Sequence, residues 1–319
     1  MSEFLQQVIN IPKGTFKRID LSIARLPSHT LIEMPIFVFR GKEAGKSLLL
    51  TAGIHGDEIN GIMLLRQMIS ENLLMPDKGT VIVIPLVNVY GFLQSTRELP
   101  DGRDLNRSFP GTLTGSLATR IAYILMHDVV PFIDFGVDFH TGGNRINNYP
   151  QIRCVFDDEK NIELATAFSP PFLLNSGLIE KSFRKEAANL GKSILVYEGG
   201  ESLRLDDFSI KEGKNGVKRL MHYLGMKEDD CPATNETIIL HKTSWVRAKA
   251  SGLFDTNLKY GEKVREGQIL AHITDPYGTT QIAVKCKTDG YIVGINNMPI
   301  VNAGDALIHI GERKIKKKD

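Results

Sequence analysis

Residues Leu48–Ile62 read LLLTAGIHGDEINGI, and the fold of the whole chain can be predicted by working outward from this stretch. Its first half is an apolar run typical of a buried strand, which ends at Gly53. Apolar residues then recur near helical spacing over Ile59–Met68. His55 and Glu58 lie in the short connection between the two patterns. A strand that leads into a helix through a polar turn is typical of open α/β sheets, which bind ligands at the carboxyl ends of their strands.

Similar strand and helix patterns alternate along the first two thirds of the chain. The predicted strands are Phe16–Leu21, Leu31–Phe39, Ser47–Ala52, Thr80–Asn88, Phe135–Phe139, Ile152–Phe156 and Ser193–Val196. The predicted helices run from Ile59 to about Leu74 and over Ser116–His127, Asn161–Phe168, Lys181–Leu190 and Ile210–Leu224. Residues 1–45 are expected to be extended, without long helices, because they contain Pro12 and Pro35. This alternation predicts an α/β fold in which helices flank a mixed β-sheet.

From about residue 234 the helical period disappears. Short strands are predicted between glycine-bearing turns, at Thr237–Leu240, Ser244–Ala250, Gly267–Ile273, Gln281–Lys285 and Tyr291–Ile295. We therefore predict two domains, residues 1–233 and a small all-β domain of residues 234–319.

The predicted β domain contains a weak internal repeat, since residues 250–273 are echoed by residues 288–310. The two halves resemble the pseudo-symmetric sandwich of biotinyl and lipoyl carrier domains. In those carriers a lysine caps the hairpin between the halves, whereas the corresponding turn here, Thr274–Thr280, reads TDPYGTT and has no lysine. We therefore predict a structural module that carries no cofactor.

Composition excludes several classes of protein. The chain has 319 residues and a formal net charge of +2, which gives no electrostatic case for nucleic-acid binding. The basic run Lys314–Lys318 is predicted to be a solvated tail. Cys154, Cys231 and Cys286 are widely spaced and suggest no disulfide framework. With no signal peptide or membrane-spanning segment recognised either, a soluble cytoplasmic protein without a membrane partner is expected.

Three side chains are candidate ligands of one metal ion. His55 and Glu58 follow one predicted strand, and His140 follows another, so they can meet at the same edge of the sheet. Two histidines and a glutamate leave one position of a tetrahedral zinc ion open, the pattern of a catalytic site. Asp138 can accept the other N–H of the His140 ring and fix its orientation, or it can cap a nearby turn. A His-x-x-Glu pair on its own is also a frequent chance feature of surface loops.

The polar segment Pro100–Gly111 lies between these ligands in the sequence. It can be a solvated loop, but Asn106 and Arg107 offer a carboxamide and a guanidinium suited to holding a carboxylate. Arg97 and Arg103 are further cations that could polarise a carbonyl beside the metal.

Four motifs in a fixed order carry a resemblance to a known family. His55-x-x-Glu58, Asp104-Leu-Asn-Arg107, Asp138-Phe-His140 and Tyr197-Glu198-Gly-Gly resemble the succinylglutamate desuccinylase and aspartoacylase family, a branch of the zinc carboxypeptidase-like fold. The likeness covers roughly residues 45–225, and the β domain that follows also fits this family.

The resemblance implies a role for each matching residue. His55, Glu58 and His140 match the ligands of one zinc ion per chain. Glu198 matches the carboxylate that takes a proton from the attacking water and passes it to the leaving nitrogen; without the other motifs, it would instead be interpreted as a salt-bridged strand end.

The resemblance also suggests residues that contact the substrate. Asn106 and Arg107 match the pair that holds the substrate carboxylate. An upstream arginine stabilises the oxyanion in this family, and Arg97 is preferred over Arg103 for this role. Arg153 either contacts a second substrate carboxylate or forms a salt bridge along its strand.

The sequence therefore predicts a cytoplasmic, zinc-dependent amidohydrolase that removes the acyl group from a small N-acyl amino acid, with a β domain that narrows the entrance and excludes long peptides. The alternatives are a carboxypeptidase-like peptidase acting on short peptides and a metal-binding or ligand-binding homologue without activity. The oligomeric state stays open, with a homo-oligomer among the expectations. Trp245 is expected to be a packing residue or to overhang the pocket. Structural roles are predicted for the remaining histidines, His29, His127, His222, His241, His272 and His309.

Overall fold

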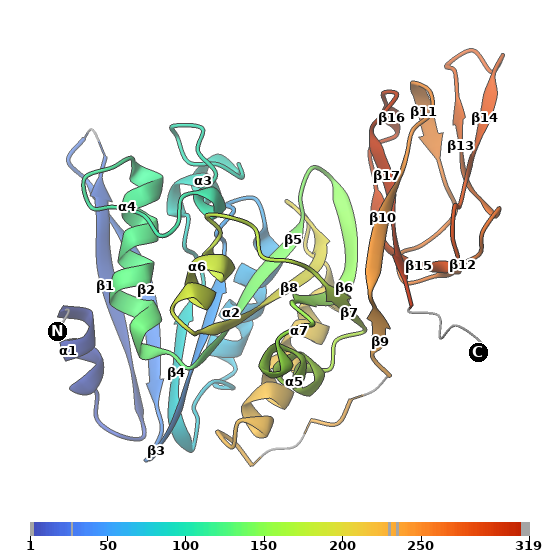
Figure 1. The fold of residues 1–319 in the computed structure, drawn as a ribbon. Coiled ribbons are helices and arrows are strands. Elements are labelled where there is room, and N and C mark those ends of the chain that lie inside the picture. The colour runs from blue at the N-terminus through green and yellow to red at the C-terminus, as the bar shows by residue number, and fades with distance from the viewer. Residues whose placement is uncertain (1–2, 27, 229–230, 234–235, 314–319) are drawn as a thin grey trace.

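The computed structural model describes residues 3–26, 28–228, 231–233 and 236–313. Most of the strands belong to one large mixed sheet (Figure 1). The strands before residue 202 are β1 (Thr15–Arg25), β2 (Leu31–Arg40), β3 (Glu43–Ala52), β4 (Lys78–Ile84), β5 (Phe135–Gly142), β6 (Ile146–Cys154), β7 (Phe172–Asn175) and β8 (Ser193–Glu201). The helices are α1 (Glu3–Ile9), α2 (Ile59–Ser70), α3 (Val89–Gln94), α4 (Leu117–Ile124), α5 (Glu159–Phe168), α6 (Phe183–Asn189) and α7 (Asp207–Tyr223). Short helical turns are η1 (Leu105–Arg107), η2 (Leu125–Val129) and η3 (Val130–Phe132).

The later strands are β9 (Ile238–Leu240), β10 (Lys242–Arg247), β11 (Gly252–Asp255), β12 (Lys263–Val264), β13 (Ile269–Thr274), β14 (Gln281–Lys285), β15 (Gly290–Asn296), β16 (Ile300–Val301) and β17 (Ala306–Glu312). The segment Lys242–Glu312, which contains β10 to β17, is called the C-terminal β unit below. In Figure 1 it projects from one end of the molecule.

The centre of the large sheet is parallel. Its strand order is β1-β2-β4-β3-β5-β8-β6-β15-β17-β10, in which β4, β3, β5 and β8 run in the same direction. Parallel strands of this kind are buried on both faces, so they need apolar side chains at successive positions. The run in β3 meets this need, since Leu48 and Leu50 enter one core cluster and Leu49 enters the other. The sequence prediction of a mixed sheet flanked by helices is therefore confirmed.

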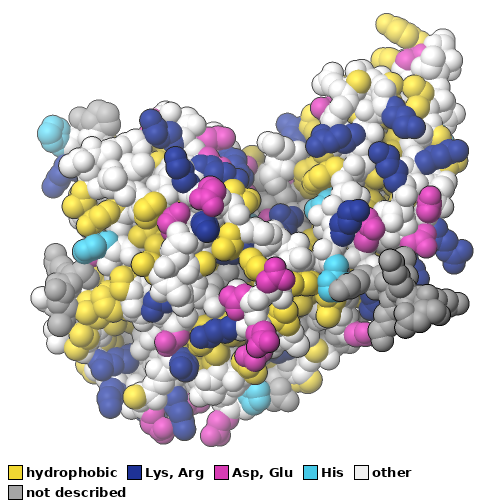
Figure 2. All heavy atoms as spheres, in the orientation of Figure 1, with side chains coloured by type: hydrophobic (Ala, Val, Ile, Leu, Met, Phe, Trp, Pro, Cys, Tyr) yellow, Lys and Arg dark blue, Asp and Glu magenta, His cyan; other side chains and the backbone are white. Residues whose placement is uncertain are grey.

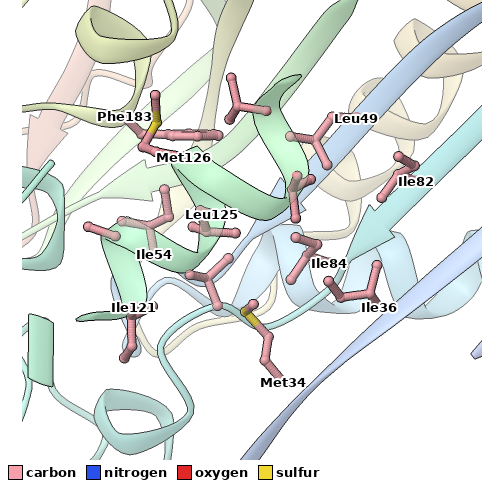
Figure 3. Close-up of a cluster of buried hydrophobic side chains, with 14 of the residues drawn as sticks. Met34, Ile36, Leu49, Ile54, Ile82, Ile84, Ile121, Leu125, Met126 and Phe183 are labelled. Carbon is pink, nitrogen blue, oxygen red and sulfur yellow. The ribbon is translucent and has the colours of Figure 1, made fainter. Parts of the chain in front are cut away.

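Two layers of helices cover the sheet. On one face α1, α4 and α6 pack over the cluster that includes Leu49, Ile82, Leu125 and Phe183 (Figure 3). On the other face α2, α5 and α7 pack over the cluster that includes Leu50. Burial of these apolar faces is the main source of stability for elements of this length.

Some predicted elements differ from the observed ones. The prediction for residues 1–45 missed the short helix α1, and α3 and β7 were also missed. The helix predicted to reach Leu74 ends at Ser70, because Asn72 adopts a left-handed conformation with φ of 55°. The strand predicted for Ile152–Phe156 is the last part of β6, and the strand predicted for Thr80–Asn88 ends at Ile84.

The C-terminal β unit contains a small antiparallel sheet with the order β14-β13-β11-β16. The predicted repeat is visible as two runs of three strands, β11-β12-β13 and β15-β16-β17, which exchange their short middle strands: β12 pairs with β15, and β16 pairs with β11. The predicted turn between β13 and β14 is organised by Asp275, which accepts hydrogen bonds from Tyr277 and Thr279.

The C-terminal β unit is joined to the rest of the protein by strand pairing. In the large sheet β15 of this unit pairs with β6, and β9, which precedes the unit, pairs with β7. The predicted domain boundary between residues 233 and 234 adjoins residues outside the described part of the chain, so the division into two domains stays a prediction. The predicted basic tail Lys314–Lys318 also lies outside the described residues. No helix in the described ranges has the length and apolar character needed to cross a lipid bilayer.

Candidate active site

Three buried side chains meet at the carboxyl edge of the parallel strands. His55 lies in the turn after β3, Glu58 directly precedes α2, and His140 lies in β5. One potential ligand atom from each lies within 4.8 Å of the other two. Glu58 contacts both rings, with 2.7 Å from Oε1 to His55 Nδ1 and 2.9 Å from Oε2 to His140 Nδ1. The structure thus brings the predicted ligand triad together.

The turn that carries His55 requires a glycine. A β-carbon on Gly56 would lie 1.9 Å from the carbonyl carbon of Gly91, which is far inside van der Waals contact. The turn can therefore lie directly against α3 only because residue 56 has no side chain.

A carboxylate lies at the far nitrogen of each imidazole. Asp138 Oδ2 is 2.7 Å from His140 Nε2, and Asp104 Oδ1 is 3.2 Å from His55 Nε2. The first contact is the one predicted for Asp138, whose other oxygen accepts a hydrogen bond from Thr51 Oγ1 at 2.8 Å. The second contact was not predicted, although Asp104 opens one of the motifs. Such partners fix the orientation of an imidazole, so that its other nitrogen is directed at the metal.

The electrostatics of the triad are dominated by these close pairs. Burial alone would raise the pKa of Glu58, but the two adjacent imidazoles outweigh burial and hold that pKa well below its usual range. Burial would lower the pKa of His140, but Asp138 and Glu58 raise it well above its usual value. The pKa of His55 is raised for the same reason, against burial, by Glu58 and Asp104. The site therefore attracts positive charge, either as protons on the imidazoles or as a metal cation.

The donor set fits a divalent metal ion. Two imidazole nitrogens and one carboxylate oxygen are the ligands of many catalytic zinc sites, which keep a fourth position for water or substrate. A buried carboxylate between two histidines also supplies the negative charge that such an ion requires. His55, Glu58 and His140 would hold the ion.

The structure separates the two arginines that were left as alternatives. Arg97 Nη1 lies 3.2 Å from Glu58 Oε1, and its other nitrogens donate to Asp104 Oδ2 at 3.0 and 3.2 Å. Arg103 has a side chain that is 62% exposed, with its closest ion pair to Asp101 at 3.6 Å. Arg97 is therefore beside the triad, whereas Arg103 faces solvent.

A cavity of about 310 Å³ opens beside the triad. In Figure 2 the surface is hollowed between the C-terminal β unit and the rest of the protein, with Lys and Arg side chains along the hollow. All the residues predicted to act on metal or substrate line the cavity: His55, Glu58, Arg97, Asn106, Arg107, His140, Arg153 and Glu198.

Asn106 and Arg107 lie in η1 at the cavity wall. Asp104 begins this turn, and its carboxylate accepts the Asn106 backbone N–H at 2.7 Å. The Asn106 side-chain oxygen accepts the backbone N–H of Phe183 at 2.9 Å. This bond holds in place the carboxamide of Asn106, a residue that lines the cavity. Arg107 donates to the Asn106 carbonyl at 2.6 Å.

Glu198 lies in β8 beside β5, where it is the strand neighbour of the metal-ligand candidate His140. Two donors from β6 contact its carboxylate: Asn148 Nδ2 lies 2.6 Å from Oε2, and Arg153 Nη1 lies 3.0 Å from Oε1. Two roles were predicted for Arg153, and its ion pair with Glu198 matches one of them, the salt bridge. Asn148 was not identified from the sequence, where no motif distinguishes it from Asn147 beside it.

One residue of the C-terminal β unit also lines the cavity. Trp245 in β10 reaches the wall and stacks on His309 of β17, with 4.5 Å between ring centroids and 8° between planes. Trp245 therefore packs within its own unit and borders the cavity, so both predicted alternatives describe it. Burial, together with the charge of Arg153, lowers the pKa of His309 to about 3, which keeps this ring neutral at physiological pH.

A buried His-Glu-His triad that shares a cavity with a further carboxylate and several arginines, at the carboxyl edge of an α/β sheet, defines a metal-dependent hydrolase. Residues 44–224 match the succinylglutamate desuccinylase/aspartoacylase catalytic domain. The chain belongs to this family, as the sequence motifs predicted, and it is a metal-dependent deacylase.

Individual relatives resemble the chain over nearly its whole length. N-alpha-acetyl-L-2,4-diaminobutyric acid deacetylase of Halomonas elongata is 28% identical over 297 residues, covering 88% of this chain and 86% of the relative. A succinylglutamate desuccinylase/aspartoacylase structure from Rhodobacter sphaeroides has a TM-score of 0.82 and 25% identity, covering 95% of this chain and 98% of its own. The product-bound structure of an ectoine utilization protein from Ruegeria pomeroyi has a TM-score of 0.83 and 23% identity, with the same coverage.

Proposed function

We propose that this protein is a zinc-dependent amidohydrolase, with one zinc ion per chain, that removes the acyl group from a small N-acyl amino acid. The observation that carries the proposal is that the triad, Glu198, Arg97 and the Asn106–Arg107 turn all line the same cavity of about 310 Å³. A volume near the lower end of the range for ligand pockets, about 300–1,000 Å³, suits a small molecule.

A zinc ion held by His55, Glu58 and His140 would lower the pKa of a coordinated water to about 7 and polarise the amide carbonyl. The chain itself would supply the proton transfer. Glu198 would take the proton of the attacking water on a carboxylate oxygen and give it to the leaving nitrogen. Each carboxylate oxygen has a second lone pair, so the contacts from Asn148 and Arg153 leave room for this proton.

The substrate would be oriented by other groups that line the cavity. Asn106 and Arg107 would hold the free carboxylate of the amino acid through charge-assisted hydrogen bonds. Arg97, with Nη1 beside Glu58, would place positive charge where the carbonyl oxygen becomes negative in the transition state.

The arginines of the cavity favour a short, uncharged acyl group such as acetyl. Arg97 and Arg153 are engaged by carboxylates, and Arg184 donates to three backbone carbonyls. Arg107 has a hydrogen bond to the carbonyl of its neighbour Asn106. Within the described residues that line the cavity, this leaves one guanidinium for a substrate carboxylate. A succinyl group would bring a second carboxylate, which would have to share Arg153 with Glu198, since Arg153 holds Glu198 through Nη1 and its Nε has no partner.

The C-terminal β unit would act as a cover. Trp245 lines the cavity, so the unit narrows the entrance and would exclude long peptides. We also propose that the catalytic part has the zinc carboxypeptidase-like fold and that the β unit is a sandwich related to biotinyl and lipoyl domains, which the exchange of β12 and β16 supports. The turn Thr274–Thr280 has no lysine to carry a cofactor. The cytoplasm is the proposed compartment, since the three cysteines are all free thiols.

The test is hydrolysis of a panel of N-acetyl and N-succinyl amino acids, read as released amine, with zinc content measured on the same samples. Glu198→Gln should retain zinc and lose at least about 100-fold in kcat, because it cannot accept the proton. Glu201→Gln is the matched control: Glu201 is a buried glutamate in the same strand β8, but it bonds to Asn297 and does not line the cavity. Equal turnover by the Glu198→Gln variant and the parent would refute the role of Glu198, and absence of activity on the whole panel would refute the substrate class.

A further inference from the structure

Asn148 links the carboxylate of Glu198 to the C-terminal β unit. Its Nδ2 donates to Glu198 Oε2 at 2.6 Å, a short bond of the kind formed with an ionised acceptor. The Asn148 side chain is buried. In β6 it lies between two neighbouring strands, where it pairs with Gly200 of β8 on one side and with Gly294 of β15 on the other.

Gly294 leaves the space in which the Asn148 carboxamide lies. A β-carbon on Gly294 would lie 2.5 Å from Asn148 Oδ1, closer than such atoms can approach. The φ angle of Gly294 is not among the positive ones, so glycine is needed here for space and not for its conformational freedom. Any larger residue at this position would push the carboxamide out of its place against Glu198.

Arg153 holds the other oxygen of Glu198, but it differs from Asn148 in its surroundings. Both residues line the cavity, but the Arg153 side chain is 27% exposed, whereas Asn148 is buried. Asn148 is therefore the more rigid of the two donors, because its side chain is short and buried, whereas that of Arg153 is long and partly exposed.

We infer that Asn148 is a positioning residue for the catalytic carboxylate of Glu198, and that Gly294 of the C-terminal β unit sets the orientation of Asn148. The C-terminal β unit thus contributes to catalysis through the sheet, in addition to covering the cavity. This inference rests on the proposed function, in which Glu198 carries the proton. A carboxylate that loses one of two donors samples more rotamers, and only some of these face the attacking water.

The first measurement is steady-state kinetics of Asn148→Ala. The expected result is a loss of roughly 10- to 100-fold in kcat, the range for one hydrogen bond to a charged group, with KM and zinc content unchanged. Asn148→Asp should lose at least as much, since it replaces the donor with a second carboxylate. A purely structural role for Asn148 predicts instead a lower melting temperature with an unchanged kcat for the folded fraction.

The second measurement is a double-mutant cycle with Gly294→Ala. Alone, this change should lower kcat about as much as Asn148→Ala. In the Asn148→Ala background it should have little further effect on kcat, because the atom with which the new methyl group collides is gone. If the fold losses in kcat of the two single variants multiply in the double variant, the proposed coupling between the two residues is refuted.

Gly311→Ala serves as the matched control. Gly311 is in the adjacent strand β17, and a β-carbon there would also lie 2.5 Å from a side-chain atom, Cδ1 of Leu240. This change should perturb packing of the same unit without altering kcat. An equal fall in kcat for Gly311→Ala and Gly294→Ala would refute the specific path through Asn148.

Glu198→Gln distinguishes a failure of this inference from a failure of the proposed function. If it abolishes turnover while Asn148→Ala does not change kcat, the inference fails and the proposed function stands. If Glu198→Gln keeps full turnover, the proposed role of Glu198 fails, and the inference fails with it.

Discussion

Replacing Asp138 by Asn should weaken metal binding at the triad. Asp138 Oδ2 lies 2.7 Å from His140 Nε2, and its side chain is almost fully buried. Asn can still accept the imidazole N–H with its side-chain oxygen, but it lacks the negative charge that makes His140 a stronger ligand. Loss of such a partner typically costs about 10- to 100-fold in metal affinity, or roughly 1.4–2.7 kcal/mol. We expect Asp138→Asn at the upper end of this range, because the contact is short and screened from water.

The equivalent change at the other histidine supplies an internal comparison. Asp104 Oδ1 is 3.2 Å from His55 Nε2, and the Asp104 side chain is 21% exposed, so its charge is partly screened. Asp104→Asn should therefore weaken metal binding less than Asp138→Asn. Thr51→Val is the control for packing, since it removes the hydroxyl that donates to Asp138 and leaves the charge beside His140.

The assay is competition between the apoprotein and a chromophoric zinc chelator at fixed pH and ionic strength. It gives the zinc affinity of each variant directly, and kcat at saturating zinc then shows whether the refilled site is active. An affinity of Asp138→Asn within twofold of the parent, or an equally large loss in Thr51→Val, would refute the argument that the carboxylate charge strengthens the ligand.

Three further predictions concern stability. Gly56→Ala should destabilise the protein by about 1–3 kcal/mol or more and reduce its zinc content, because the added carbon would lie 1.9 Å from the carbonyl carbon of Gly91. Gly177→Ala is the control: a β-carbon there meets open space, so the melting temperature should stay nearly unchanged. The lowered pKa of His309, about 3, means that this ring is neutral in the folded state, so its contribution to stability is fully present above about pH 6.5 and falls with acid towards pH 3. By pH 5 the loss should reach about 2 kcal/mol, and denaturant unfolding across this pH range should show a flatter profile for His309→Phe than for the parent. Removal of zinc by a chelator should lower the free energy of unfolding by about 4 kcal/mol when free zinc had been 1,000 times its Kd, and an unchanged unfolding midpoint would argue against a metal site.

The parts of this site that the sequence predicts are those that depend on local chain direction. His55 and Glu58 follow one buried strand and His140 ends another, and parallel strands deliver such residues to the same edge of a sheet. Asp138 is equally local, since it is two residues before His140 in the same strand and therefore on the same face.

The elements that were missed are short ones. The helices α1 and α3 and the strand β7 have seven, six and four residues, which is too few for a periodic pattern to stand out from its surroundings. The sequence favoured Arg97 over Arg103 for the position beside the metal, but its spacing did not decide between them. A turn closed by hydrogen bonds among Leu99, Gly102 and Arg103 directs one arginine to the triad and the other to solvent, and the spacing along the chain does not reveal its geometry.

The surroundings of Glu198 could not be predicted because they depend on which distant strands become neighbours. No sequence motif marks Asn148 or Gly294, and the two residues become neighbours only because β6 pairs with β15 in the large sheet. Which distant strands become neighbours depends on the packing of the whole fold, and the apolar pattern of one strand does not identify its partner. The metal ligands could therefore be identified one motif at a time, whereas the orientation of the proton-transferring carboxylate is a property of the assembled sheet. For this reason, a change in the C-terminal β unit can alter turnover without touching a residue that any motif would have marked.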